Sequence, residues 1–469
     1  MGGFFGIISK TNAVKDLFFG TDYHSHLGTK RGGLAVKKQN GFFKSIHSIE
    51  NALFRSKFAD EVRDLRGNSG IGVISDYENQ PLVIRSHLGD YAIVTVSAIN
   101  NMEFLYQKAL KNKGIHFSES SRGEINPTEL VAALINQEQS FEKGIVNVQE
   151  SIKGSCSILI LTEKGLYASR DKLGRTPIVL GEKKDSYAVT LETCAFPNLN
   201  FKTIQYLGPG EIVFMTEQGI EQKKSPQKNM QICAFLWVYY GYPSSSYEGI
   251  NVEFVRNQCG AKLSENDDIQ PDFVAGIPDS GIAHGLGYAN KAGIPFKRPF
   301  VKYTPTWQRS FMPQEQKSRD LVATMKLIPV HKMIRQKKLL FCEDSIVRGT
   351  QLKDTIQRLF DLGALEVHMR PACPPLLFKC KFLNFSRSKS ELDLAARKAI
   401  IQLEGQDFSG IQEYTQYGSD KYSQMVDKIR QRLNLTSLKY QKLNDLVEAI
   451  GLPKQRLCTY CWDGTEPYA

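Results

Sequence analysis

The chain lacks any long apolar segment, because none of its hydrophobic runs approaches the roughly 18 to 20 residues that a helix needs to cross a bilayer. Residues 1–6 also lack the basic stretch and apolar core of a secretory signal. We therefore expect a cytoplasmic protein with no membrane partner. With 41% hydrophobic and 23% charged residues, the 469-residue chain is long enough for two or three globular domains.

Blocks of positive charge are missing, although 60 Lys and Arg against 49 Asp and Glu give a formal net charge of +11. The basic residues are dispersed and no nucleic-acid recognition motif accompanies them, so we expect no nucleic-acid partner. Excess positive charge concentrates phosphates near a protein. The charge therefore fits either an anionic small ligand or a need for solubility alone.

Cysteine is absent before Cys156, and the only C-x-x-C pair is formed by Cys458 and Cys461. In a long cytoplasmic chain, the nine cysteines are expected to be buried thiols, metal ligands or nucleophiles rather than disulfides. The absence excludes a cysteine nucleophile near the start of the chain.

The chain contains two regions that differ in their pattern of apolar and polar residues. Residues 1 to about 230 contain short apolar runs punctuated by Gly, Asn and Asp, which is typical of a β-rich domain. The polar segment Gln222–Asn229 breaks the pattern and is a candidate linker. Strands are expected at Gly70–Ser75, Tyr91–Ser97, Ser157–Thr162, Tyr187–Thr190 and Glu211–Thr216, and helices at Asn101–Lys113 and Thr128–Gln137.

From about Asp272, short apolar strands alternate with segments of helical length. This alternation predicts a parallel α/β sheet. The tail Glu391–Ile450 is mostly helical in pattern. The expected strands are Phe273–Ile277, Phe300–Tyr303, Lys338–Cys342 and Glu366–Arg370, and the expected helices are Gly281–Ala292 and Gln351–Leu362.

The segment Lys338–Thr350 carries the clearest chemical signal. An apolar strand ends in Glu343 and Asp344, and a short Ser/Gly/Thr loop then opens a helix. Such a loop directs backbone N–H groups and the positive end of a helix dipole at a phosphate. Paired carboxylates suit ribose hydroxyls or a hydrated Mg²⁺. The segment predicts a sugar 5-phosphate site, and the alternative is a solvated acidic turn.

The segment Glu343–Thr350 resembles the phosphoribosyl pyrophosphate (PRPP) signature of type I phosphoribosyltransferases, and the wider match is to the glutamine PRPP amidotransferase family. The resemblance implies an α/β, two-domain fold. An Ntn-hydrolase-like αββα sandwich would occupy residues 1–230, and a type I phosphoribosyltransferase parallel-sheet domain with a helical tail would occupy residues 231–469. The motifs that carry it are residues 277–281, Lys302-Tyr303, Arg309–Pro313, Gln316, Arg319, Lys326-Leu327, Tyr23-His24, residues 30–33, Arg170-Asp171-x-x-Gly174, Pro177 and residues 209–211.

The resemblance also implies roles for single residues. Glu343 and Asp344 would bind the ribose hydroxyls and Mg²⁺, with Ser280 beside the metal and the pyrophosphate. Backbone amides from Ile346 to Thr350 would hold the 5-phosphate. The family usually carries two aspartates where Glu343 and Asp344 stand. The predicted PRPP site comprises Ser280, Lys302, Glu343, Asp344, Ser345, Arg348, Gly349 and Thr350, and the predicted catalytic residues are Asp344, Arg309 and Lys326.

The front of the chain lacks the family's glutaminase residues. The family nucleophile is an N-terminal cysteine whose own amino group is the base, but Gly2 and Gly3 follow Met1 here. Residues 72–76 replace the strand whose arginine grips the glutamine carboxylate, residues 95–98 replace the oxyanion-hole His-Asn-Gly, and residues 126–129 contain no Asp. Since one lost oxyanion donor costs roughly 10²–10³ in rate, we expect no glutaminase activity.

Cys233, Cys380, Cys458 and Cys461 fall where an iron–sulfur subset of the family places its cluster ligands. The resemblance therefore implies a structural [4Fe–4S] cluster that ties the C-terminal tail to the domain junction. Zinc bound by the same thiolates, or reduced free thiols, are the alternatives.

Three functions remain open from the sequence. The resemblance implies an enzyme that forms 5-phosphoribosylamine from PRPP, the first committed step of purine synthesis, with ammonia rather than glutamine as nitrogen donor. A phosphoribosyltransferase with another amine acceptor is the second, and a PRPP-binding regulator without turnover is the third. The family also leads us to expect a purine nucleotide effector and a homo-oligomer.

Overall fold

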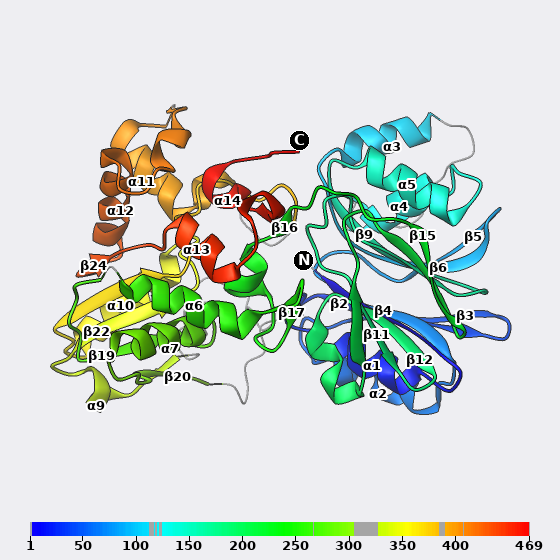
Figure 1. Ribbon diagram of the computed structural model, residues 1–469, viewed down its shortest axis with the longest axis horizontal. Helices are drawn as coiled ribbons and strands as arrows, with labels where there is room; N and C mark the ends of the chain where they lie inside the picture. Colours follow the sequence, from blue (N-terminus) through cyan, green and yellow to red (C-terminus); the bar gives the residue numbers. More distant parts are fainter. Residues whose placement is uncertain are drawn as a thin grey trace.

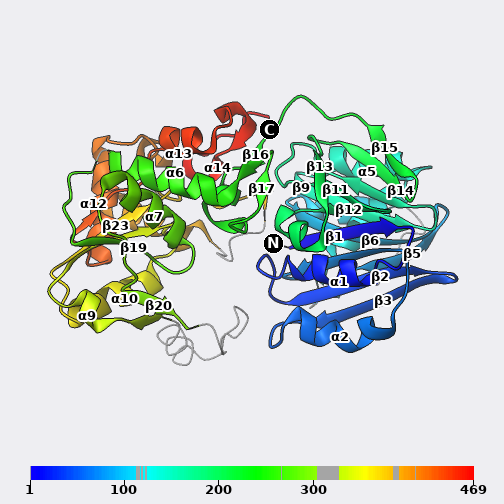
Figure 2. The ribbon, with the colours of Figure 1, turned by 60° about the horizontal axis from the view of Figure 1, so that its bottom comes forward.

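The computed structural model describes residues 2–111, 117, 120–121, 124–265, 267–303, 327–383, 390–406 and 408–468. The chain forms two lobes, and both of its ends lie near the junction between them (Figures 1 and 2). We call the lobe built from residues 3–224 the front half, and the lobe that begins at Ile232 the rear half. No helix among these described residues is long and apolar enough to span a membrane.

The front half consists of two stacked antiparallel sheets. The seven-stranded sheet has the order β13-β11-β12-β1-β4-β2-β3, and the six-stranded sheet has the order β15-β14-β10-β9-β6-β5. The strands are β1 (Gly3–Ser9), β2 (Arg31–Lys38), β3 (Gly41–Ser48), β4 (Ser69–Ser75), β5 (Leu82–Ser86), β6 (Gly89–Ile99), β9 (Gly154–Thr162), β10 (Leu166–Ser169), β11 (Val179–Lys183), β12 (Ser186–Thr190), β13 (Lys202–Tyr206), β14 (Ile212–Thr216) and β15 (Gly219–Lys224), beside the short hairpin β7 (Ser120–Ser121) and β8 (Glu124–Ile125).

Helices cover both outer faces of this sandwich, so the central strands are buried on two sides and read as continuous apolar runs. In β1, Phe4 and Ile8 pack between the sheets, whereas Phe5 and Ile7 pack against the helices α1 and α2. The second sheet packs in the same way against α4 and α5. The layers form the expected αββα sandwich. The helices are α1 (Val14–Asp22), α2 (Phe54–Asp64), α3 (Met102–Leu110), α4 (Pro127–Ile135) and α5 (Phe141–Ser151).

The rear half is built on a parallel sheet with the order β19-β22-β23-β24. Leu340 and Cys342 of β22 pack on one face against α6, α7 and α13, while Leu339 and Phe341 pack on the other face against α10, α11 and α12. The elements are β19 (Phe273–Gly276), β20 (Phe300–Lys302), β21 (Leu327–Pro329), β22 (Lys338–Glu343), β23 (Glu366–Pro371), β24 (Ser437–Leu438), α6 (Val252–Glu265), α7 (Gly281–Ala292), α9 (His331–Ile334), α10 (Thr350–Asp361), α11 (Ala395–Glu404), α12 (Asp420–Arg432) and α13 (Leu443–Ile450).

Short elements join the two halves at the junction in Figure 1. The strand β16 (Ile232–Cys233) pairs in parallel with β25 (Leu457–Cys458), so Cys233 lies opposite Cys458. The buried Glu192 of the front half accepts hydrogen bonds from the hydroxyls of Ser245 and Tyr247 in the rear half. Nearby elements are the π-helical turn η3 (Leu236–Tyr240), β17 (Ser246–Tyr247), β18 (Ile250–Asn251) and α14 (Tyr460–Asp463).

Two expectations about single elements were wrong. The segment Gln222–Asn229 is not wholly a linker, because β15 extends through Lys224 as an edge strand of the front sandwich. The strand at Phe300 does not join the parallel sheet: β20 pairs antiparallel with β21 in a separate two-stranded ribbon. Its few residues carry the same apolar signal as a sheet strand, so periodicity alone cannot separate the two arrangements.

A buried ion pair stabilises the edge of the rear sheet. Arg370 of β23 forms a bidentate pair with Asp267, with Nε–Oδ2 and Nη2–Oδ1 distances of 2.5 and 2.9 Å, and both side chains are at most 2% exposed. The hydroxyl of Tyr288 also donates to Asp267 over 2.8 Å, and Arg370 donates to Ser437 in β24. The network therefore joins α7, β23 and β24 at one point.

We predict that Arg370→Met lowers the free energy of unfolding by about 3–5 kcal/mol, because it leaves the Asp267 carboxylate buried without a counter-charge. Urea denaturation followed by circular dichroism measures the change. The control is Arg85→Met, which breaks an ion pair with Asp90 whose arginine is 87% exposed and which should have little effect. Equal, small effects of the two variants would contradict a stabilising role for the buried pair.

Candidate functional site

The predicted acidic pair lies at the carboxyl end of β22, where open parallel sheets place their ligands. The side chains of Glu343 and Asp344 are buried, with exposed fractions of 8% and 5%. Ser280, from the loop after β19, donates its hydroxyl to Glu343 over 3.3 Å. The hydroxyl of Ser345 donates to Asp344 over 2.6 Å. The structure thus brings Ser280, Glu343, Asp344 and Ser345 together.

Two glycines allow the surrounding loops to adopt their shapes. Gly349 caps the start of α10 with a φ of +75°, in the left-handed region that side chains disfavour. Gly281, the first residue of α7, lies so close to β22 that a Cβ would stand 2.3 Å from the carbonyl oxygen of Cys342. The N-terminus of α7 therefore lies close to the end of β22, where its positive helix-dipole end favours negative charge.

The electrostatics of the pair favour a cation. Burial, the Asp344 carboxylate and a hydrogen bond with Asp344 raise the pKa of Glu343 well above the ordinary range. The buried guanidinium of Arg256 lies within electrostatic range of Asp344 while it donates to three backbone carbonyls of residues 237–241. Two carboxylates cannot ionise side by side in a buried site without added positive charge, which a divalent metal would supply.

The other predicted PRPP residues are distributed differently. Lys302 forms an ion pair with Asp279 of the loop before α7. Arg348 points toward Asp393, with 3.7 Å between charged atoms. Thr350 is the first residue of α10. The predicted catalytic residues Arg309 and Lys326 lie outside the described residues.

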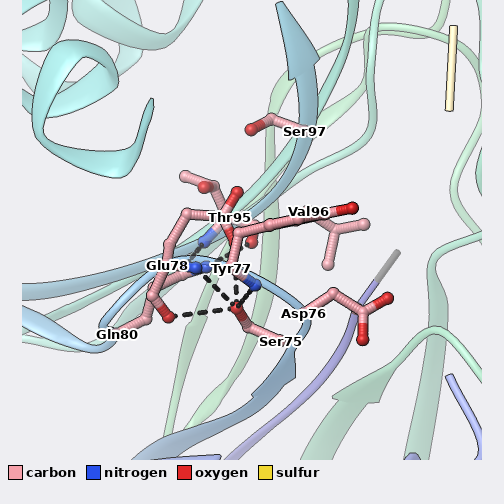
Figure 3. Close-up of a pocket in the computed structure, with 9 residues that line it drawn as sticks. Ser75, Asp76, Tyr77, Glu78, Gln80, Thr95, Val96 and Ser97 are labelled. Carbon is pink, nitrogen blue, oxygen red and sulfur yellow. Dashed lines mark hydrogen bonds between the residues drawn. The ribbon is translucent and has the colours of Figure 1, made fainter. Parts of the chain in front are cut away.

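In the front half, the segments that stand where the family carries its glutamine-binding residues lie close together. Gly2, residues 75–80 and residues 95–97 line one cavity (Figure 3), and Thr128 hydrogen-bonds to Thr95 beside it. The cavity has a volume of about 20 Å³, which is room for about one water molecule.

Hydrogen bonds hold several of the side chains that line the cavity. Gln80 donates to the carbonyl of Thr95 over 3.1 Å and accepts from its N–H over 2.7 Å. Ser75 and Glu78 hydrogen-bond to each other in the turn after β4, as the dashed lines in Figure 3 show. At Gly2, an added Cβ would stand 2.4 Å from the carbonyl oxygen of Ile74 in β4. The position that carries the family nucleophile therefore has no room for a side chain.

The predicted cluster ligands gather at the junction. Cys233 and Cys458 face each other on the paired strands β16 and β25. Cys233 lies within electrostatic range of Cys458 and Cys380, and Cys461 lies within range of all three. Burial raises the pKa of each of these thiols, to about 11 for Cys458, and Arg175 opposes this effect at Cys233, Cys380 and Cys458. Four thiols from three distant segments thus share one site.

The structure gives no ready-made site for a single metal ion at these thiols. Within the part of the chain that the structure describes, no group of three or more His, Cys, Asp or Glu side chains is arranged so that it could hold a metal ion. Zinc would need four ligands at about 2.0–2.3 Å from one centre. A [4Fe–4S] cluster would instead bind each of its four thiolates to a separate iron.

Sequence reasoning missed three features of these sites. Arg256 was hidden because its role depends on a helix packing beneath the acidic pair, which no local pattern reveals. Gln80 was missed because a residue that fills a pocket carries no motif. Arg175 was missed because its contact with Cys458 joins residues 283 positions apart.

Comparisons with known proteins agree with this geometry. A family model described as a glutamine amidotransferase domain matches residues 69–197, a region inside the front half that begins after Gly2. The amidophosphoribosyltransferase of Methanocaldococcus jannaschii is 28% identical to the chain, over 100% of the chain and 98% of that protein. The chloroplastic amidophosphoribosyltransferase of Glycine max is 30% identical, over 94% of the chain and 74% of that protein.

A solved structure resembles the chain over its whole length. The glutamine PRPP amidotransferase of Bacillus subtilis, in complex with ADP and GMP, superposes with a TM-score of 0.85 and 26% identity, over 99% of this chain and 97% of that one. The similarity covers the front sandwich, the parallel sheet and the junction between them. Together with the plant relative, it shows that the chain belongs to the amidophosphoribosyltransferase family.

Proposed function

We propose that the chain transfers an amine to PRPP and forms 5-phosphoribosylamine, with ammonia rather than glutamine as the nitrogen donor. The observation that carries the proposal is the contrast between two sites: Ser280, Glu343, Asp344 and Ser345 lie together at the end of β22, whereas the front cavity is small and Gly2 offers it no nucleophile. The relatives are named amidophosphoribosyltransferases, which supports the transferase chemistry. The residue roles that follow are part of the proposal.

The acidic pair would hold the sugar and its metal. Glu343 and Asp344 would accept hydrogen bonds from the ribose hydroxyls and would bind Mg²⁺ with Ser280 nearby. When bound, Mg²⁺ would stabilise the negative charge of the departing pyrophosphate. The start of α10, with Ser345, Arg348, Gly349 and Thr350, would hold the 5-phosphate. Lys302, Arg309 and Lys326 would neutralise the pyrophosphate.

Displacement at the anomeric carbon passes through an oxocarbenium-like state, so the carboxylate of Asp344 would stabilise the positive charge that develops on the ribose ring. Burial strengthens this interaction, because Asp344 is only 5% exposed and water screens it poorly. Arg256 lies within electrostatic range of Asp344 and adds positive charge near the acidic pair.

We predict that Asp344→Asn and Glu343→Gln each lower ammonia-dependent PRPP consumption by at least about 100-fold, because each removes a charge that binds the metal and the ribose. Isotope-labelled PRPP measures consumption and identifies the product. The control is Asp361→Asn, which removes an exposed carboxylate near the other end of α10 and should leave the rate unchanged. Full activity of Asp344→Asn would contradict the assigned site.

The loss of glutaminase activity would be structural as well as chemical. Without a nucleophile at Gly2, an acyl-enzyme cannot form, and Gln80 fills the space that the substrate would need. The front half would then serve as a packing partner of the rear half. We propose residues 1–230 as a glutamine amidotransferase-like domain without activity, and residues 231–469 as the phosphoribosyltransferase domain.

We predict that the purified chain releases no glutamate from glutamine above a heat-treated control, and that Gly2→Cys does not restore release. A cysteine Cβ at this position would clash with the Ile74 carbonyl of a central strand. The measurement is a coupled glutamate assay with an active glutaminase as positive control. Glutamate release by the unmodified chain would contradict the proposal, and release by Gly2→Cys alone would show that the cavity can open.

The thiol set would hold a structural [4Fe–4S] cluster. Its support is the convergence of Cys233, Cys380, Cys458 and Cys461 at a junction between distant segments. Bound there, the cluster would supply no step of the transfer. It would link β16 and β25 to the loop after β23 and so fix the C-terminal tail against the junction.

We predict that anaerobically purified protein shows broad visible absorbance and about four irons per chain. Cys458→Ser should lose most of this iron because it removes a ligand thiolate. The control is Cys156→Ser, which alters a buried thiol of β9 in the front half and should keep the iron. Zinc in place of iron would refute the cluster, and protein with neither metal would leave only free thiols.

Two alternatives share the PRPP site. A different amine acceptor would appear as PRPP consumption that depends on that amine and not on ammonia. A regulator without turnover would bind PRPP and Mg²⁺ but consume none. Because the Bacillus subtilis structure is in complex with ADP and GMP, we also infer a purine nucleotide effector. Assembly into a homo-oligomer is a further part of the proposal.

A further inference from the structure

A buried arginine of the front half reaches into the thiol site of the rear half. Arg175 is 5% exposed and lies in the loop between β10 and β11. Its Nη1 donates to the sulfur of Cys458 over 3.0 Å. Its guanidinium carbon lies 3.3 Å from the ring centroid of Phe382, two residues beyond Cys380, so the group is packed between a sulfur and an aromatic ring.

No carboxylate compensates this buried charge. Among the residues that the structure describes, Arg175 forms no ion pair, and its Nε has no hydrogen-bond partner. Of the other buried arginines, Arg370 pairs with Asp267, Arg170 donates to Glu248 and three backbone carbonyls, and Arg256 donates to three backbone carbonyls. The guanidinium of Arg175 instead donates to a sulfur, and because a buried charge is costly unless it is paired, an anion beside it would stabilise this position.

The groups that can supply the anion are thiolates. Cys233, Cys380 and Cys458 all lie within electrostatic range of Arg175. Four metal-bound thiolates carry more negative charge than the iron–sulfur core neutralises, so the site would be anionic when loaded. An arginine beside the site would then lower the electrostatic energy of the buried thiolates and of the buried guanidinium.

We propose that Arg175 of the front half is the counter-ion of the thiolate site in the rear half. The front half would supply this charge across the junction, although it would have no glutaminase activity itself. The inference rests on the proposed cluster. It assigns Arg175 as a positioning residue that orients Cys458 through an N–H···S bond and offsets the negative charge of the loaded site. The front half would therefore be retained because it completes a site in the rear half.

The backbone around Arg175 is fixed on both sides. Asp171 accepts hydrogen bonds from the N–H groups of Leu173 and Thr176, and Gly174 adopts a φ of +63° between them. The carbonyl of Arg175 accepts from the N–H of Cys233 over 3.1 Å. The Arg-Asp-x-x-Gly motif, which is part of the family resemblance in the sequence, therefore builds the turn that presents Arg175 to the sulfurs.

The test uses the full-length protein, loaded and purified without oxygen. We predict that Arg175→Met loses iron to a chelator at least about 10-fold faster than wild type. Its cluster midpoint potential should shift to more negative values, because reduction adds an electron to a site that has lost a positive charge. Arg175→Lys keeps the charge and should restore the potential toward wild type, although it lacks the planar fork of arginine.

A control separates the charge from simple weakening of the junction. Asn100→Ala removes an exposed contact across the same interface, the 2.7 Å hydrogen bond from Asn100 to the carbonyl of Lys381, and should change neither readout. If Arg175→Met fails to fold, Arg175→Gln, which keeps an N–H donor without charge, takes its place and should shift the potential in the same direction.

Three results would overturn the inference or its basis. Wild-type iron retention and potential in the Arg175 variants would overturn the counter-ion while leaving the cluster intact. Equal effects of Asn100→Ala and Arg175→Met would assign the change to the interface alone. Wild-type protein without iron would instead remove the cluster proposal, and the inference with it, before any variant is compared.

Discussion

The burial of two adjacent carboxylates at the end of one strand is the constraint on which the rear half depends. Glu343 and Asp344 are kept from water by the turn after β19 and by the start of α10, and they can both remain ionised only when positive charge is nearby. The start of α7 and Arg256 lie near the pair, and a divalent metal would add further positive charge. A phosphorylated sugar with its metal satisfies the same constraint, which connects the packing of the sheet to the proposed chemistry.

The front half is stabilised independently of the cavity at Gly2. Its two sheets bury their strands on both faces, so the sandwich is stabilised by apolar contacts that do not involve the cavity at Gly2. Hydrogen bonds among Gln80, Thr95, Ser75 and Glu78 hold the lining of that cavity. The front half also contacts the rear half through Glu192, which accepts from Tyr247, and through Arg175, which donates to Cys458.

The sequence predicted most of the architecture because strong local patterns survive in it. The segment Gly281–Ala292 was predicted with the bounds that the structure has, and the strand before Glu343 was placed within one residue of its observed end. The αββα layers came from the family resemblance rather than from periodicity. Long-range pairings such as Arg175 with Cys458 could not be predicted, because they depend on how two halves dock and leave no trace in neighbouring residues.

The central proposal is that the acidic pair supports PRPP consumption, whereas the front cavity does not hydrolyse glutamine. One competition experiment tests it directly: the enzyme receives PRPP, Mg²⁺, ¹⁵N-labelled ammonia and glutamine with an unlabelled amide, and the isotope in the product amine is measured by mass spectrometry. The account predicts phosphoribosylamine that carries ¹⁵N and no glutamate. Product that carries the unlabelled nitrogen, with an equal amount of glutamate, would contradict it.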